Sequence, residues 1–187
     1  MTGSAHSAYR LALEELGAVL DRTDDREVDR AVQAIAAARH VSVFGGGREG
    51  LQIRGFAMRL FHLGRSVSVV GDMTTPALGS GDVFLVTVGP GEISTAVALA
   101  GVAKSAGAKV LVITAQPEGR VPKMADQVLL LPAQTMANDQ GPSVSLLPMG
   151  SVYEGALFVL FEIMILKLKD TLKISSETMR GNHTNME

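Results

Sequence analysis

The chain has 187 residues, of which 47% are hydrophobic and 4% are aromatic, and its formal net charge is −2. This length and composition fit one α/β domain with an aliphatic core and exclude a disordered chain. The charge balance gives no sign of a nucleic-acid partner, and a sequence with no cysteine excludes disulfides and thiolate chemistry.

The most apolar run of the sequence covers residues 155–170 and contains Glu162 and Lys167. It is too short and too charged to span a membrane. The first ten residues, MTGSAHSAYR, lack the apolar centre of a signal peptide. We therefore expect a cytoplasmic protein without a membrane segment.

Two helices come first, because apolar residues recur at helical spacing over 5–20 and 25–38. Short apolar strands then alternate with helices. We expect strands at 41–44, 66–70, 82–88, 109–114 and 127–131. We expect helices at 49–63 and 92–106, a short helix or turn near Lys123, a long helix from Pro148 to about 170, and a polar tail over 174–187 that can form a last helix.

This alternation predicts right-handed βαβ units and a parallel sheet. The strands are apolar on both faces, so helices must cover both sides of the sheet. We predict a three-layer α/β/α sandwich of flavodoxin-like type with a five-stranded parallel sheet. We expect residues 1–187 to form one domain, with amino-terminal helices over 1–38, an α/β core over 39–170 and a tail helix over 171–187.

Two glycine-rich loops, FGGGREG at 44–50 and VGPGEIST at 88–95, each follow a strand and open a helix. Ligands of open parallel sheets bind at the carboxyl ends of strands, and helix N-termini attract anions. Arg48 in the first loop can bind a phosphate or a carboxylate. The alternative is that each loop is a tight turn without a ligand. A dinucleotide site is weakly supported, because Val70 stands where an acidic residue is wanted.

Two candidate acid–base residues lie in the last third of the chain. Glu154 lies at the start of the long helix in very apolar sequence, where partial burial would raise its pKa as a general base requires. An acidic residue there is also simply favourable for the helix. His183 and Glu187 are four residues apart, so Glu187 can orient the imidazole if the segment is helical. A histidine near a chain end is more often solvated.

The segments GGGREG, FAMRLFHLG, VVGDMTTPAL, GPGEIST, PKMADQVLLLPA, LPMGSVYEGAL and HTNME, in this order, resemble the 6-phospho-3-hexuloisomerases of the sugar isomerase (SIS) domain superfamily over nearly the whole chain. The resemblance implies a tetramer that interconverts 3-hexulose 6-phosphate and fructose 6-phosphate through a cis-enediol, without metal or organic cofactor. It implies that Glu154 shuttles the proton. It also implies that His183, from its own or a neighbouring subunit, assists ring opening or moves protons between oxygens.

The same resemblance places substrate binding in the two loops, at Gly46, Gly47, Arg48, Glu49, Thr87, Gly89, Gly91, Glu92, Ser94 and Thr95. The family pattern is close to GAGRSG in the first loop, where Glu49 replaces serine. It is close to SGSGETTS in the second, where Val88, Pro90 and Ile93 replace hydroxyl residues. Pro90 also lacks a backbone N–H, and Glu49 repels a dianion unless it turns away.

We therefore predict a sugar isomerase with a weakened grip on phosphate, whose substrate is a sugar phosphate or a different, non-phosphorylated sugar. The alternative is a non-catalytic SIS module that binds a carbohydrate derivative or serves as a regulatory ligand sensor. The helix over 155–166 is apolar on more than one face, which homo-oligomerisation explains. The partners that we expect are a small sugar or sugar phosphate and copies of this chain, with no nucleic acid.

Overall fold

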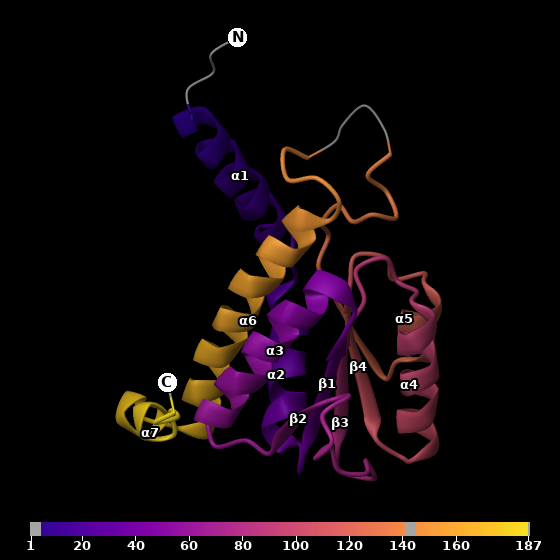
Figure 1. The fold of residues 1–187 in the computed structure, drawn as a ribbon, viewed down its shortest axis with the longest axis vertical. Coiled ribbons are helices and arrows are strands. Elements are labelled where there is room, and N and C mark those ends of the chain that lie inside the picture. Colours follow the sequence, from indigo (N-terminus) through magenta and orange to yellow (C-terminus); the bar gives the residue numbers. More distant parts are fainter. Residues whose placement is uncertain (1–4, 141–144, 187) are drawn as a thin grey trace.

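The structure is a computed structural model that describes residues 5–140 and 145–186 (Figure 1). Within these residues, five strands form one parallel sheet in the order β2-β1-β3-β4-β5. The strands are β1 (Val41–Gly45), β2 (Val67–Val69), β3 (Val83–Thr87), β4 (Lys109–Thr114) and β5 (Gln127–Leu130). The helices are α1 (Ala5–Leu20), α2 (Asp25–Ala37), α3 (Gly47–His62), α4 (Ser94–Ser105), α5 (Arg120–Met124), α6 (Ser151–Leu172) and α7 (Ser176–Gly181).

Helices cover both faces of this sheet. Helices α2, α3 and α6 pack on one face, and α4 and α5 pack on the other (Figure 1). Every residue of the central strand β3 is buried, as expected for a strand with helices on both sides. The predicted three-layer sandwich and its five-stranded parallel sheet are confirmed.

Helix α6 extends beyond the sheet and packs against α1 (Figure 1). The two helices approach closely at Gly155, where an added Cβ would lie 2.9 Å from Cδ2 of Leu16. The first turn of α6 thereby lies near the carboxyl ends of the strands, where it lines a cavity together with the loops after β1 and β3.

Several element boundaries differ from the predictions. Helix α6 begins at Ser151 rather than directly after Pro148, because Met149 and Gly150 adopt left-handed backbone conformations with φ of 57° and 81°. Helix α4 begins at Ser94, because Gly91 has φ of 79° and the preceding residues form a turn. Among the described residues, no helix is both long and apolar enough to cross a membrane.

Candidate active site

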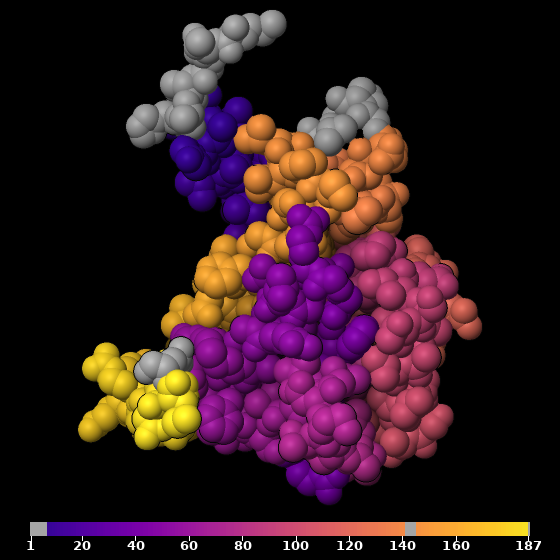
Figure 2. Space-filling model, viewed as in Figure 1, coloured from indigo at the N-terminus to yellow at the C-terminus, as the bar shows by residue number. Residues whose placement is uncertain are grey.

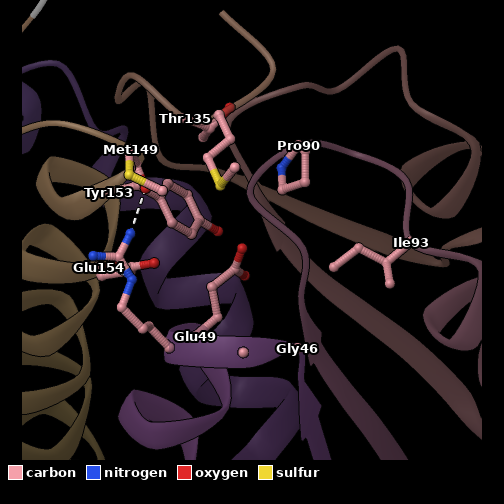
Figure 3. A pocket seen from close by; sticks show the side chains of 12 residues that line it. Gly46, Glu49, Pro90, Ile93, Thr135, Met149, Tyr153 and Glu154 are labelled. Carbon is pink, nitrogen blue, oxygen red and sulfur yellow. Dashed lines mark hydrogen bonds and ion pairs between the residues drawn. The ribbon is translucent and has the colours of Figure 1, made fainter. Parts of the chain in front are cut away.

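A cavity of about 460 Å³ lies at the carboxyl ends of β1 and β3 (Figure 3). Its walls come from the start of α3, the β3–α4 loop, the chain after β5 and the start of α6. The lining residues are Gly46, Gly47, Arg48, Glu49, Pro90, Ile93, Thr135, Met136, Met149, Gly150, Tyr153 and Glu154. The predicted first loop and Glu154 therefore meet at one cavity, as the strand-end rule for parallel sheets requires.

Arg48 and Glu154 form an ion pair in this cavity. The Nε atom of Arg48 lies 3.0 Å from Oε2 of Glu154, whose side chain is 15% exposed. Arg48 also donates to the hydroxyl of Ser151 at 2.8 Å and to the carbonyl oxygen of Met149. These contacts hold the guanidinium against the first turn of α6.

The environment of Glu154 acts on its acidity in two directions. Partial burial raises the pKa of Glu154, and the positive charge of Arg48 opposes this increase in pKa. The result is a carboxyl group that is more basic than an exposed glutamate and that keeps an oriented charged partner. Such a group can accept a proton from a carbon acid and return it.

Glu49, in the first turn of α3, points away from solvent toward the β3–α4 loop. Its side chain is buried, and its carboxylate accepts the hydroxyl of Thr87 at 2.8 Å. The backbone N–H of Gly89 donates to both oxygens, at 3.0 and 3.1 Å. Burial raises the pKa of Glu49 to about 6, while these hydrogen bonds oppose the increase.

Tyr153 forms the floor of the cavity beside Glu49, and Figure 3 shows the tyrosine hydroxyl directed toward the Glu49 carboxylate. The buried hydroxyl donates to the carbonyl oxygen of Ile113 at 3.0 Å and lies 3.1 Å from the hydroxyl of Thr87. Burial raises the pKa of Tyr153 well above its ordinary value. The phenol is therefore a neutral hydrogen-bonding group at neutral pH.

Five further residues line the cavity without having been predicted from the sequence, namely Tyr153, Thr135, Met136, Met149 and Gly150. Tyr153 directly precedes Glu154 in the long helix, which was the available indication that it also faces the cavity. The other four residues belong to the stretch between β5 and α6, which shows no periodicity in the sequence. Their place in the cavity wall depends on tertiary contacts and not on local spacing.

The second glycine-rich loop contributes apolar groups to the cavity. Pro90 and Ile93 face it from the side opposite Tyr153 (Figure 3). Gly91 instead packs against Gly119, where an added Cβ would lie 2.4 Å from the carbonyl oxygen of Gly91. The two glycines therefore permit a close approach of two loops, as a tight turn requires. The predicted part of Gly91 in substrate binding stays a prediction.

Other predicted binding residues of this segment do not line the cavity. Thr87 and Gly89 are buried behind the Glu49 carboxylate. Glu92 is exposed, and its Oε1 lies 3.9 Å from Nη1 of Arg120. Ser94 and Thr95 are exposed at the start of α4. Their predicted part in substrate binding stays a prediction.

Glu154 lies in the first turn of α6, whereas His183 follows α7, which lies at the carboxyl end of α6 (Figure 1). Leu172, the last residue of α6, lies 18 positions after Glu154, which corresponds to roughly 27 Å along the helix. The ring of His183 lies 5.0 Å from that of His62, measured between centroids. Helix α7 ends at Gly181, so His183 lies outside a helix. Glu187 lies outside the described residues, and its pairing with His183 stays a prediction.

Metal ligands do not gather in the described part of the chain, where no group of three or more His, Asp or Glu side chains is placed to hold a metal ion. The charged residues that line the cavity are Arg48, Glu49 and Glu154. The chemistry that these groups offer is proton transfer and hydrogen bonding.

Comparison with known proteins connects this cavity with a family. Residues 34–159 match the SIS domain. The chain belongs to the SIS domain family. The matched range of the SIS domain includes both glycine-rich loops, Tyr153 and Glu154, and it ends before α7 and His183.

Two curated relatives of this SIS domain protein carry the same name. It is 34% identical over 163 residues to 3-hexulose-6-phosphate isomerase of Bacillus subtilis, covering 87% of this chain and 88% of the relative. It is 36% identical over 177 residues to 3-hexulose-6-phosphate isomerase of Mycobacterium gastri, covering 95% of this chain and 88% of the relative. The predicted relationship to the 6-phospho-3-hexuloisomerases is confirmed. The prediction that the chain is a sugar isomerase is confirmed with it.

A solved structure shows the same fold. The chain superimposes on a Methanococcus jannaschii protein with a TM-score of 0.83, covering 96% of this chain and 98% of that one. For that protein, a molecular function of 3-hexulose-6-phosphate isomerase was inferred from its crystal structure. At 24% sequence identity, the likeness shows that the SIS fold is shared.

Proposed function

We propose that this chain moves a carbonyl group between neighbouring carbons of a sugar or sugar phosphate, through a cis-enediol. The observation that carries the proposal is the position of Glu154, partly buried at one cavity wall and held by Arg48 at 3.0 Å. The two relatives named 3-hexulose-6-phosphate isomerase support the same reaction class.

The proposed reaction needs one base that acts twice. The Glu154 carboxylate removes a proton from the carbon next to the substrate carbonyl, and the C–H electron pair forms the double bond of the enediol as the carbonyl oxygen takes up a proton. Glu154 then returns its proton to the former carbonyl carbon. The hydroxyl on the carbon that was first deprotonated loses its proton as the new carbonyl forms, which balances the proton taken up by the first oxygen. Arg48 orients the carboxylate and stabilises its ionised form.

We also propose that the chain works as a homo-oligomer, a tetramer as the resemblance implies, in which His183 of a second copy reaches this cavity. The separation of His183 from Glu154 along α6 supports a contribution from another copy. Helices α3 and α6 share an exposed face (Figure 2). Large hydrophobic side chains are exposed on these two helices, namely Leu51, Met58, Phe61, Phe158, Ile163 and Leu166. A second copy would bury such residues.

Solvent exchange tests the isomerase proposal. The protein is incubated in D₂O with fructose 6-phosphate, fructose and other ketoses, and deuterium incorporation next to the carbonyl is followed by NMR. Glu154→Gln is expected to abolish exchange and to retain binding, because it removes the base and keeps the shape of the side chain. Glu162→Gln is the matched control, since Glu162 lies on the same helix and pairs with Arg59 at 3.1 Å.

The result also separates an isomerase from a module that only binds carbohydrate derivatives. Exchange that is lost in Glu154→Gln and kept in Glu162→Gln supports the isomerase. Sugar binding without exchange in the unmodified protein would instead assign the chain to the binding class.

A further inference from the structure

The Glu49 carboxylate occupies the position at which the β3–α4 loop would otherwise receive an anion from the cavity. It accepts the N–H of Gly89 with both oxygens and the hydroxyl of Thr87 with one. Backbone N–H groups after a parallel strand, next to the start of a helix, are typical ligands of phosphate groups. Here a side chain of the protein itself binds them.

The rest of this loop segment offers little to an anion. Pro90 has no N–H, and the N–H of Gly91 donates to the carbonyl oxygen of Val88 at 2.9 Å. The side chains of Pro90 and Ile93 turn apolar atoms toward the cavity. Positions 89–91 therefore have their N–H groups bound within the protein or missing.

The charges of the cavity also disfavour a dianion. Arg48 is the basic residue among the lining side chains, and it is bound to Glu154, Ser151 and the carbonyl oxygen of Met149. With Glu49 and Glu154 both ionised, the lining side chains carry one excess negative charge. A phosphate beside Glu49 would lie next to a like charge in a partly apolar cavity, where such repulsion is strong.

A neutral hydroxyl fits the same position. A carboxylate has about four acceptor positions, and the contacts with Thr87 and Gly89 number three. One acceptor position is left for a donor from the cavity. A sugar hydroxyl can donate to it, whereas an ionised phosphate oxygen cannot.

We propose that Glu49 is a specificity-determining residue that fills the anion site of the β3–α4 loop from within the protein, so that the substrate end facing this loop is an uncharged sugar hydroxyl and not a phosphate. This inference rests on the proposed function in that it names the substrate class of the same cavity. The preferred substrate is accordingly a non-phosphorylated sugar.

Binding of matched ligand pairs tests the proposal without relying on turnover. Fructose, fructose 6-phosphate and inorganic phosphate are titrated at pH 8 and followed by NMR. The unmodified protein is expected to bind fructose 6-phosphate no more tightly than fructose. Glu49→Ser frees the N–H of Gly89 and removes the negative charge, so we expect the affinity for fructose 6-phosphate and for inorganic phosphate to rise roughly tenfold or more.

Two further variants make the result specific. Glu49→Gln keeps the size of the side chain and an acceptor for the N–H of Gly89. The proposal can therefore be tested with this variant even if the serine variant does not fold. We expect Glu49→Gln to raise phosphate affinity by a smaller factor, because it removes the repulsion and leaves the N–H bound. Glu162→Ser removes one negative charge in the middle of α6, where Glu162 pairs with Arg59 outside the cavity, and we expect it to leave phosphate affinity unchanged.

Fructose 6-phosphate bound more tightly than fructose by the unmodified protein would overturn the inference. So would Glu49 variants that fold and gain no affinity for phosphate. These results are distinct from a failure of the proposed function. Absence of solvent exchange with every sugar would reject the isomerase and leave the binding preference in place, whereas exchange restricted to 6-phosphates would support the isomerase and reject the role of Glu49.

Discussion

Arg48, in the first turn of α3, holds Glu154, in the first turn of α6, with Nε and Oε2 3.0 Å apart. The pair joins two helices, although Arg48 and Glu154 are 106 positions apart in the sequence. It fixes the direction of the proposed base and, through its charge, its acidity. Changes to Arg48 should therefore affect both the rate and its pH dependence.

Arg48→Gln removes the positive charge that lowers the pKa of Glu154. The pKa of Glu154 should rise, so a smaller fraction is ionised at a given pH, and the acid limb of the kcat profile should move to higher pH. Arg48→Lys keeps the positive charge and loses the paired guanidinium hydrogen bonds to Ser151 and Met149. We therefore expect kcat to fall about tenfold, while the acid limb of the pH profile moves little. Arg59→Gln, which breaks the pair with Glu162, is the control and should leave the profile in place.

The stability of the protein should depend on pH through Glu49. Burial raises its pKa from 4.5 to about 6, so the folded protein binds an extra proton between these values. Stability is then highest below pH 4.5 for this group and falls as the pH rises through 6, by about 2 kcal/mol in total. Urea unfolding across this window should show a smaller decrease in stability for Glu49→Gln than for the unmodified protein, and the part that remains includes the contribution of Glu154, whose pKa is also raised. Glu118→Gln changes an exposed glutamate and should keep the pH dependence.

The Tyr153 hydroxyl should contribute measurably to stability, because it is buried and bound to Ile113 and Thr87. We expect Tyr153→Phe to lower the free energy of unfolding by about 1 kcal/mol. The carbonyl of Ile113 still accepts the N–H of Val88 in this variant, which limits the loss. Tyr9→Phe alters the other tyrosine, which is 72% exposed, and should change nothing. Equal effects of the two variants in urea unfolding would contradict the buried role of Tyr153.

Mixed oligomers test whether the proposed site is shared between copies. Glu154→Gln and His183→Ala are each expected to be inactive when pure. If Glu154 of one copy acts with His183 of another, equal mixing with subunit exchange should restore about a quarter of the unmodified activity. A mixture that stays inactive after demonstrated exchange would show that His183 does not complete the site of a neighbour.

The sequence by itself determined the layers and the neighbourhood of the site. The continuous apolar run of β3 required cover on both faces, and its alternation with helices required a parallel sheet. Parallel strands end at one edge, so a glycine-rich loop after β1 and another after β3 had to lie together there. The position of Glu154 at the start of an apolar helix followed from local spacing as well.

Tertiary structure decided what the side chains at that edge contact. The pairing of β1 with β3 places Gly45 opposite Thr87, and Gly45 has no Cβ, which would lie 2.8 Å from Cγ2 of Thr87. This register brings the turn carrying Glu49 against Thr87 and Gly89, and so selects the inward direction of its carboxylate. Local periodicity records which face of an element is buried, but the donors that meet a buried side chain come from a neighbouring strand. The distance of His183 from Glu154 likewise follows from the length of α6 and the packing of α7 beside α3.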